Sequence, residues 1–352
     1  MKYTDTFWRI FEYKVLVDYE RAKKFVNEKQ IPLPRFSNMY ITSSCNQNCQ
    51  YCEYKEENKK SVVMATDRVL KNIDQVYELG VRAIDFCGGG EPTLHRDLGK
   101  ILKYCRQKGI VTGLFTNLAF RNQSLLEAII ENCSYIRISL DTYDEKKYML
   151  IRRPRNENAS FRQVMSNLRA LVKLKKQKKK DIIIGTKMLI TRFNHTEIED
   201  FIKKSVKLKV DSVQFKKVSL YDELYISANA VSEMEKDFSI YKKKYGNKID
   251  ILQNFADLRL KVRCFMNINH IFIDAFGDVY LCCYYLRRKK RHKLGNIYNS
   301  RLRDIWFSDR HWRVAKNADI RECNRMDCRW IKFNNLMQDY IYEDRLCQLD
   351  FV

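Results

Sequence analysis

The segment CNQNCQYC (residues 45–52) carries three cysteines, Cys45, Cys49 and Cys52, which are separated by three and then by two residues. A structural zinc site needs four ligands, usually in Cys-x2-Cys pairs, and neither a fourth cysteine nor a histidine lies near these three. A cubane iron–sulfur cluster held by three thiolates leaves one iron open to a ligand from outside the protein. The spacing therefore favours such a cluster. A three-cysteine zinc site with a distant histidine is the alternative.

Around this segment, short apolar runs alternate with amphipathic helical patterns. Strands are expected at 39–42, 83–87, 111–117, 135–141, 182–190 and 211–218, and helices near 65–79, 95–108, 122–132, 160–178 and 195–208. Strands that are each followed by a helix predict a parallel sheet with right-handed crossovers. Spacing alone leaves a doubly wound sheet and an incomplete barrel both open. In either fold the cysteine triplet follows the first strand, at the carboxyl edge where ligands bind.

The rest of the chain divides into segments by its sequence pattern. Residues 1–36 predict a short helical preface that ends at the prolines of IPLPRF, and residues 221–262 predict a charged helical bridge between the 37–220 core and a C-terminal domain at 263–352. The segment HIFIDAFGDVYLCC (270–283) predicts a hairpin that turns at Gly277-Asp278.

Composition describes a folded globular protein, because 45% of the 352 residues are hydrophobic and only 11 are glycine. The first residues are charged where a signal peptide needs an apolar core, and no apolar run reaches the roughly 18 residues of a membrane span. We therefore expect a cytoplasmic protein without a membrane partner. In that compartment the 12 cysteines are ligands or free thiols.

The net charge of +23 includes two basic runs, KLKKQKKK (173–180) and RRKKRHK (287–293). A nucleic acid or another acidic partner is one interpretation of this charge. Solvated helix faces and a loop are the other, and it is favoured because no nucleic-acid-binding motif accompanies the basic runs.

With Tyr51 before its third cysteine, the triplet resembles the Cys-x3-Cys-x2-Cys signature of the radical S-adenosylmethionine (SAM) enzymes. The segment FCGGGEPTL (86–94) is similar to that family's Gly-Gly-Glu-Pro segment. FTNLA (115–119) is similar to its Thr-Asn-Gly strand end, with Leu118 in place of the glycine. IRISLDTYDEKKYMLIRR (136–153) is similar to its fourth strand and the loop that follows. The resemblance implies an α/β fold, an incomplete (βα)6 TIM-like barrel, in which the triplet binds a [4Fe–4S] cluster that meets SAM.

The resemblance also implies the SAM contacts. The amino group of SAM would meet the glycine-rich segment, and its ribose and carboxylate would meet the fourth strand and its loop. Because Leu118 departs from the family pattern, the resemblance supports Thr116 and Asn117 as SAM contacts less strongly than the others. For Glu91, the alternative role is that of a plain helix N-terminal acid. The cofactor-binding residues expected in this way are Tyr51, Gly89, Gly90, Glu91, Thr116, Asn117, Ser139, Arg152 and Asn194.

A second group of cysteines lies near the C-terminus. Cys264 followed by GDVYLC (277–282) resembles the start of the auxiliary-cluster domain called SPASM, or twitch in its shorter form, and CNRMDC (323–328) has fewer cysteines than full SPASM. The resemblance implies one auxiliary [4Fe–4S] cluster. The expected ligands of this cluster are Cys264, Cys282, Cys323 and Cys328, with Cys347 as a possible replacement for one of them. A zinc ribbon is the alternative to the cluster.

The remaining cysteines are expected outside the clusters. Cys87, Cys105 and Cys133 should pack as small apolar residues. Cys283 should point away from Cys282 if the strand is extended there. A free thiol at Cys87, Cys283 or Cys347 is a candidate donor of a hydrogen atom to a substrate radical.

By resemblance, the enzyme would reductively cleave SAM and use the 5′-deoxyadenosyl radical to abstract a hydrogen atom, with electrons from flavodoxin or ferredoxin. Only about 36 residues precede the first strand, too few for a peptide-recognition domain. This favours oxidation or epimerisation of a small molecule such as a sugar, an aminocyclitol or a nucleotide-linked metabolite. Modification of a peptide or of RNA is the alternative. A non-catalytic, zinc-stabilised nucleic-acid binder is the alternative from another class.

Overall fold

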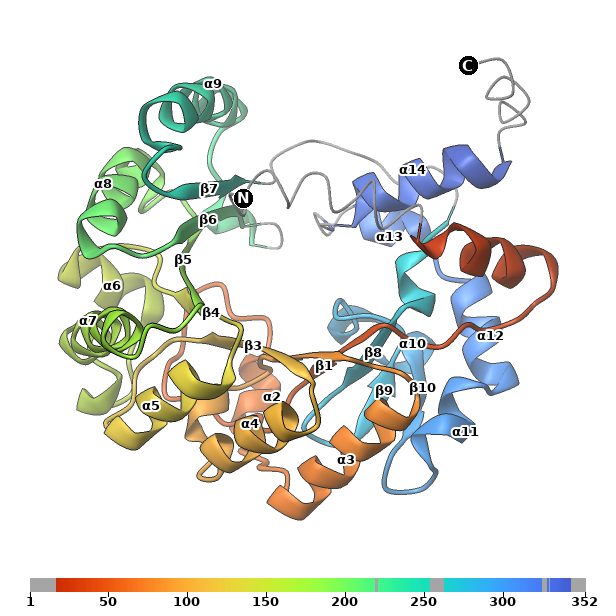
Figure 1. Cartoon of the computed structure of the whole chain (residues 1–352). Coiled ribbons are helices and arrows are strands. Elements are labelled where there is room, and N and C mark those ends of the chain that lie inside the picture. Colours follow the sequence, from red (N-terminus) through yellow and green to blue (C-terminus); the bar gives the residue numbers. More distant parts are fainter. Residues whose placement is uncertain (1–16, 219–220, 254–262, 325–327, 329, 343–352) are drawn as a thin grey trace. The chain divides into compact units, whose positions relative to one another are not determined.

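The computed structural model of the chain describes residues 17–218, 221–253, 263–324, 328 and 330–342 (Figure 1). Two compact units make up the chain. One contains Met39–Lys71 and Ala83–Phe255, and is called here the core unit. The other contains Met1–Asn38, Asn72–Arg82 and Ala256–Val352, and is called the C-terminal unit.

The core unit is a parallel sheet whose strands follow one another in sequence order. The strands are β2 (Ala83–Phe86), β3 (Val111–Thr116), β4 (Tyr135–Ser139), β5 (Ile183–Ile190), β6 (Ser212–Lys217) and β7 (Asp250–Gln253). Strand β1 (Phe36–Met39) leads into the cysteine loop. Sequential parallel strands with helical crossovers form the incomplete (βα)6 TIM-like barrel that the resemblance implies, so this fold prediction is confirmed.

Helices connect the strands, and most of them cover one face of the sheet (Figure 1). They are α2 (Lys55–Lys59), α3 (Thr66–Glu78), α4 (Leu98–Gln107), α5 (Gln123–Asn132), α6 (Glu145–Arg152), α7 (Phe161–Gln177), α8 (Ile198–Leu208) and α9 (Ala228–Tyr245), with short 3-10 turns η1 (Pro92–Leu94), η2 (Glu157–Ala159), η3 (His195–Glu197) and η4 (Asp222–Leu224).

One strand was missed. The sequence predicted only helix in residues 221–262, but β7 follows α9 there and pairs with β6 in parallel. The short run Asp250–Gln253 holds only two apolar residues, Ile251 and Leu252, which are too few to stand out from helical periodicity.

The two faces of the sheet differ because side chains alternate along a strand. Phe215 of β6 contacts Phe201 of α8 and Phe238 of α9, with ring centroids 5.8 and 5.0 Å apart, so it lies on the helix-covered face. Its neighbours on β6, Gln214 and Lys216, therefore face the other way, and we call that side the inner face.

The C-terminal unit contains the expected hairpin. Strands β8 (His270–Ile273) and β9 (Asp278–Tyr280) are antiparallel, and β9 also pairs with β10 (Lys293–Asn296). The turn needs glycine at Gly277, because its φ is +79° and a Cβ would lie 2.4 Å from the ring of Tyr298. The helices are α10 (Lys289–His292), α11 (Leu302–Trp306), α12 (Asp309–Lys316), α13 (Ile320–Asn324) and α14 (Ile331–Tyr342), with 3-10 turns η5 (Met266–Ile268) and η6 (Leu286–Arg288).

The N-terminal preface is helical over residues 17–27 and packs within this same unit. Its Ala22 joins a buried apolar cluster with Phe265, Met266, Phe333 and Met337. The helix at residues 17–27 and α14 therefore share one core. Among the described residues, the helices are too short or too polar to cross a bilayer.

Candidate active site and auxiliary cluster site

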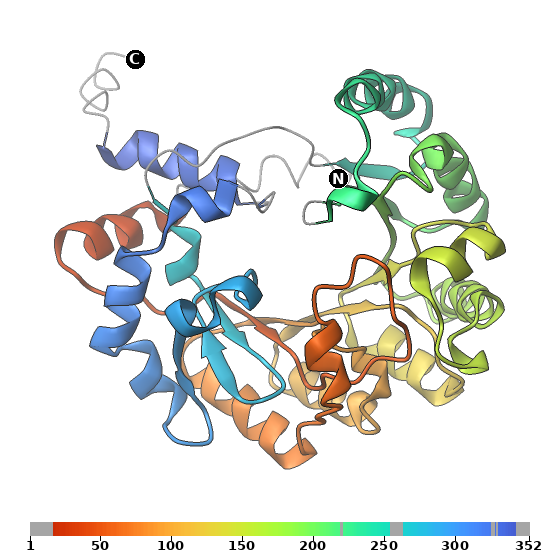
Figure 2. The ribbon, with the colours of Figure 1, turned by 180° about the vertical axis from the view of Figure 1, so that it is seen from behind.

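The cysteine triplet lies in the loop that follows β1, which Figure 2 shows in orange on the viewer's side of the core unit's strands. Cys49 is buried, and Cys45 and Cys52 are partly exposed. Burial raises the pKa of Cys45 to about 12 and that of Cys49 to about 11. The Cys49 and Cys52 thiolates raise the pKa of Cys45 further, and the Cys52 thiolate raises that of Cys49. Thiols that are grouped and costly to ionise are stabilised as thiolates by iron. This donor set fits an iron–sulfur cluster.

The glycine-rich segment after β2 holds this loop from one side. Gly90 N donates to Thr42 O at 3.2 Å, and Glu91 N donates to Ser44 O at 2.7 Å, directly before Cys45. A Cβ on Gly90 would lie 2.2 Å from Ser44 O. Glycine is therefore required at position 90 for the close approach of two backbone segments.

The end of α6 holds the loop from the other side. Gln50 N donates to Ile151 O and Asn48 N donates to Arg153 O, both at 3.0 Å. Arg153 has a φ of +47°, which turns the chain out of the helix. The backbone that carries the cysteines is thus fixed from two elements.

Glu91 is a buried hub between the ends of β2 and β3. Its Oε1 accepts from Thr93 N at 3.1 Å, Thr93 Oγ1 at 2.7 Å and Thr116 Oγ1 at 2.6 Å, and its Oε2 accepts from Asn117 N at 2.7 Å. Burial raises the pKa of Glu91, and these bonds oppose the rise. Glu91 caps η1, as the alternative expected, but its bonds also join β3 to the glycine segment.

The segment after β3 connects to the cysteine loop. Asn117 Nδ2 donates to Asn46 Oδ1 at 2.8 Å, and Asn46 Nδ2 donates to Ala119 O at 2.7 Å. Leu118, which stands where the family resemblance puts glycine, has a φ of +59°. The turn thus keeps a glycine-like backbone with a buried leucine, at some cost in strain.

Arg152, Asp141 and Tyr51 form a buried network beside Cys49. Arg152 Nη1 lies 3.1 Å from Asp141 Oδ2, its Nε donates to Gln47 Oε1 at 2.9 Å, and the Tyr51 hydroxyl donates to Asp141. Burial acts to lower the pKa of Arg152, but Cys49, Tyr51 and Asp141 raise it. A fixed positive charge therefore stands next to the Cys49 thiol.

The last two expected SAM contacts, Asn194 and Ser139, differ in burial and in hydrogen bonding. Asn194 is buried. Its Oδ1 accepts from Thr191 N at 2.8 Å, and its Nδ2 donates to Asp141 O and Leu189 O, each at 3.0 Å. Direct contact with SAM would require one of these bonds to break. Ser139 is half-buried at the end of β4, in register with Lys187 of β5.

Sequence reasoning missed Asn46, Gln47 and Asp141. Asp141 has a φ of +69° and its Oδ1 accepts from Leu189 N at 2.8 Å, so it joins β4, β5 and the cysteine loop. An acidic residue two positions beyond a strand end was the available signal, since Asp tolerates the left-handed region.

In the C-terminal unit, burial raises the pKa of Cys328, and the thiolates of Cys264, Cys283 and Cys323 raise it further. Cys283 thus belongs to the same group of thiols, together with Cys282. The expectation that Cys283 points away assumed an extended strand, but β9 ends at Tyr280 and both residues lie in a bend, so its premise is wrong. Cys347 lies outside the described residues.

Arg288 and His292 place nitrogen atoms beside these thiols. Arg288 Nη1 lies 3.4 Å from Cys323 Sγ and Nη2 lies 4.0 Å from Cys282 Sγ, while the arginine side chain is buried. His292 Nδ1 lies 3.8 Å from Cys282 Sγ. Burial, with Arg288 and Arg291, lowers the pKa of His292 to about 3, so it is neutral.

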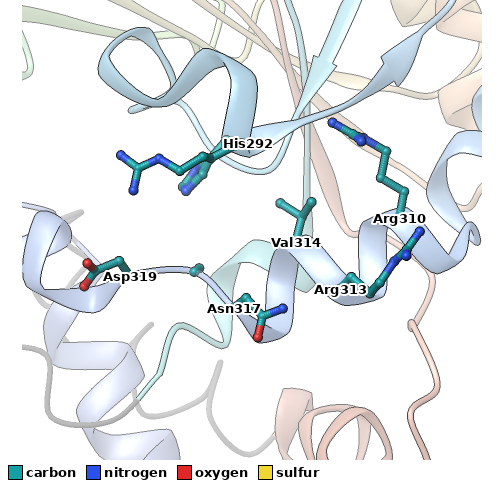
Figure 3. Close-up of a pocket in the computed structure, with 8 residues that line it drawn as sticks. His292, Arg310, Arg313, Val314, Asn317 and Asp319 are labelled. Atoms are coloured by element: carbon teal, nitrogen blue, oxygen red, sulfur yellow. The ribbon is translucent and has the colours of Figure 1, made fainter.

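His292 also lines a cavity of about 380 Å³ on this unit (Figure 3). Arginines dominate its wall, and Arg310 is held by a bond from its Nε to Lys293 O at 2.7 Å. The cavity is lined by Arg291, His292, Arg310, Arg313, Val314, Asn317, Ala318 and Asp319.

Within the described part of the chain, no three His, Cys, Asp or Glu side chains gather in the manner of a single-metal site. In a cubane each cysteine binds a different iron, so cluster ligands stand further apart than zinc ligands do. The other cysteines, Cys87, Cys105 and Cys133, are buried as expected for small apolar residues.

Comparison with known proteins agrees with this geometry. The Radical SAM superfamily model matches residues 39–205, and the SPASM model, an iron-sulfur cluster-binding domain, matches residues 264–329. These domains imply a SAM-binding [4Fe–4S] cluster, SAM and an auxiliary iron–sulfur cluster.

Relatives of known sequence match different shares of the chain. The uncharacterized protein MJ0907 of Methanocaldococcus jannaschii is 26% identical over 69% of this chain and 82% of its own length. The PqqA peptide cyclase of Bradyrhizobium diazoefficiens is 25% identical over 51% of this chain and 46% of its own length. The GTP 3',8-cyclase of Clostridium botulinum is 26% identical over 56% and 62%.

Solved structures share the fold over most of the chain. Streptococcus suis SuiB bound to precursor peptide SuiA superimposes with a TM-score of 0.68 at 15% identity, covering 87% of this chain and 72% of SuiB. The structure of anSMEcpe with bound AdoMet gives 0.61 at 18% identity, covering 90% and 95%. Because both family models match, the chain belongs to the radical SAM superfamily of enzymes and carries a SPASM iron–sulfur domain after its core.

Proposed function

We propose that this protein is a radical SAM enzyme that modifies an amino-acid residue of a peptide. The observation that carries the proposal is the pairing of a radical SAM core at residues 39–205 with a SPASM domain at 264–329. Structures of SuiB and of anSMEcpe with bound peptides share the fold over 87% and 90% of this chain. The PqqA peptide cyclase supports the same class of substrate.

Our sequence-based preference was for a sugar, an aminocyclitol or a nucleotide-linked metabolite. The structures of SuiB and anSMEcpe with bound peptides, which cover 87% and 90% of this chain, favour a peptide instead. GTP 3',8-cyclase is one small-molecule counterexample, and its match covers 56% of this chain. We therefore place peptide modification first and a nucleotide second.

The chain's own residues would prepare the reaction. When bound, the cluster and SAM supply a 5′-deoxyadenosyl radical that abstracts a hydrogen atom. Cys45, Cys49 and Cys52 would hold the cluster, and the nearby charge of Arg152 would offset the negative charge of the ligands. Glu91 would receive the amino group of SAM, and Thr116 and Asn117 would hold the Glu91 carboxylate in place.

The remaining expected contacts have different roles in this proposal. Gly89 and Gly90 would let the backbone approach SAM, and Ser139 would reach it from the inner face. Tyr51 and Asn194 would position the site through Asp141, because their polar atoms bond to that residue. A reductant such as flavodoxin or ferredoxin would supply the electron.

In the C-terminal unit, Cys264, Cys282, Cys323 and Cys328 would hold the auxiliary cluster, and Arg288 would tune it. Held by these cysteines, the cluster would supply an electron acceptor, and this favours a net oxidation of the substrate. Alternatively it would only anchor the peptide.

The test is anaerobic reconstitution with iron and sulfide, followed by incubation with SAM, dithionite and peptides encoded beside the gene. We expect 5′-deoxyadenosine and a mass change in one peptide. A triple variant with Cys45, Cys49 and Cys52 replaced by Ala is the control and should form neither. Conversion of GTP without change in any peptide would overturn the proposal, and zinc in place of iron would overturn the enzyme assignment.

A further inference from the structure

Basic side chains gather on the inner face of the core sheet. Ser139 of β4, Lys187 of β5 and Gln214 of β6 are register partners, so they point to the same side. Phe215 contacts the helices, which places Gln214 and its partners on the inner face. Two positions further along β6, Lys216 has the same orientation as Gln214.

Arg137, also on β4, belongs to this group of inner-face residues. It lies two residues before Ser139, so it shares the inner face. Its guanidinium lies 3.5 Å from the ring centroid of Phe115, and its Nη1 donates to Gln214 Oε1 at 2.7 Å. Arg137 is thus held in a fixed direction by β3 and β6.

Lys187 stands in the middle of these cations. In the described chain its ammonium group has no hydrogen-bond or ion-pair partner, although the side chain is at least half-buried. Burial, together with Arg137 and Lys216, lowers the pKa of Lys187 to about 7. Asp141, the carboxylate that raises its pKa, is already bonded to Arg152 and to Leu189 N.

A cation of this kind costs free energy unless an anion accompanies it. The Lys187 ammonium group is therefore an unpaired donor on the inner face, with Arg137 and Lys216 near it. It lies two residues before Leu189, whose backbone N–H bonds to Asp141 of the Arg152–Asp141 pair. Binding sites in barrels of this fold lie at the carboxyl ends of the strands, and Lys187 is in the second half of β5.

We propose that Lys187, with Arg137 and Lys216, binds an anionic group of the substrate. Resting on the proposed function, that group is a carboxylate of the peptide, from an acidic side chain or the C-terminus. A single carboxylate accepts bonds from several donors at once, and pairing with three cations removes their mutual repulsion.

The experiment measures protection of Lys187 from acetic anhydride at pH 7, read by mass spectrometry of the tryptic digest. The probes are N-acetyl-L-glutamate and inorganic pyrophosphate, each added to the reconstituted protein with SAM. We expect N-acetyl-L-glutamate to slow acetylation of Lys187 but not of Lys203, which lies on the exposed side of α8 and pairs with Glu199. Equal labelling with and without the probe would overturn the site.

Calorimetry of the same probe gives the second readout. Lys187→Gln should weaken its binding about tenfold, since a hydrogen bond to a charged group is lost, and Lys203→Gln should leave it unchanged. Unchanged binding in folded Lys187→Gln would overturn the proposal. Protection by pyrophosphate alone would overturn the carboxylate assignment and indicate a nucleotide.

These outcomes are separable from the proposed function. Protection of Lys187 in an enzyme that modifies no peptide would overturn the proposed function and support the anion site. An unprotected Lys187 in an enzyme that does modify a peptide would overturn the anion site alone.

Discussion

Arg152 and Asp141 form a buried ion pair, with Nη1 and Oδ2 3.1 Å apart, directly beside the cysteine loop. The pair joins the end of α6 to the end of β4, and Tyr51 joins the loop to both through its hydroxyl. A buried pair of this kind contributes most through what its loss leaves behind, which is an uncompensated charge.

Asp141→Asn tests this pair. Asparagine tolerates the left-handed φ of +69° and keeps an acceptor for Leu189 N, but the guanidinium loses its counter-charge. We expect the free energy of unfolding of the cluster-free protein to fall by about 3 kcal/mol, measured by urea denaturation. Asp200→Asn, which removes an exposed i,i+4 pair with Lys204, should cost less than about 0.5 kcal/mol. Equal effects would show that burial of the first pair has no consequence.

Glu91→Gln tests the placement of SAM. The amide loses the charge that would attract the amino group of SAM, so we expect the SAM concentration for half-maximal 5′-deoxyadenosine formation to rise about tenfold. Thr93→Val is the matched control, because it removes one donor to the same carboxylate and keeps its charge. If both variants needed the same SAM as the unmodified protein, Glu91 would be structural only.

The two cysteine sets are separable by iron content. Reconstituted protein should hold about eight irons per chain, the content of two cubanes. Cys264→Ala should lose about four and still cleave SAM with dithionite, because its ligand set is separate from Cys45, Cys49 and Cys52. Circular dichroism must accompany the assay, since metal binding and folding are coupled. A folded Cys264→Ala protein with full substrate turnover would contradict an electron-accepting role.

Arg288→Leu should move the reduction potential of the auxiliary cluster to more negative values. The buried guanidinium, 3.4 Å from Cys323 Sγ, favours the reduced and more negative cluster. Arg291→Leu removes an exposed cation that pairs with Glu322 and is the control. Redox titration followed by electron paramagnetic resonance gives the potential. Equal shifts in the two variants would indicate a general charge effect.

The stability contribution of Lys187 should depend on pH. Its pKa of about 7 lies below the ordinary 10.5, because burial, Arg137, Lys216 and Arg152 outweigh Asp141. Between these values the unfolded chain binds more protons, so stability rises with pH in that window. Lys187→Met should therefore raise Tm most below pH 7, with the gain shrinking toward pH 10. A gain that does not vary with pH would mean that Lys187 titrates normally.

The spacing of Cys45, Cys49 and Cys52, and the alternation of strands and helices around them, were readable from the sequence. Both depend on local periodicity and on residues a few positions apart, which is where sequence patterns carry physical information. The hairpin that turns at Gly277 followed from the same kind of signal. The choice of an incomplete barrel over a doubly wound sheet came from the family resemblance, because spacing alone left both open.

Only the tertiary structure brought Asp141 to Arg152, Asn117 to Asn46, and Lys187 between Arg137 and Lys216. It also showed β7, and it placed Cys283 among the C-terminal thiols. These relationships depend on which strands become neighbours and in what register, and on where a strand ends. Residues that are tens of positions apart meet only once the strands have paired, so no local sequence pattern predicts their contact.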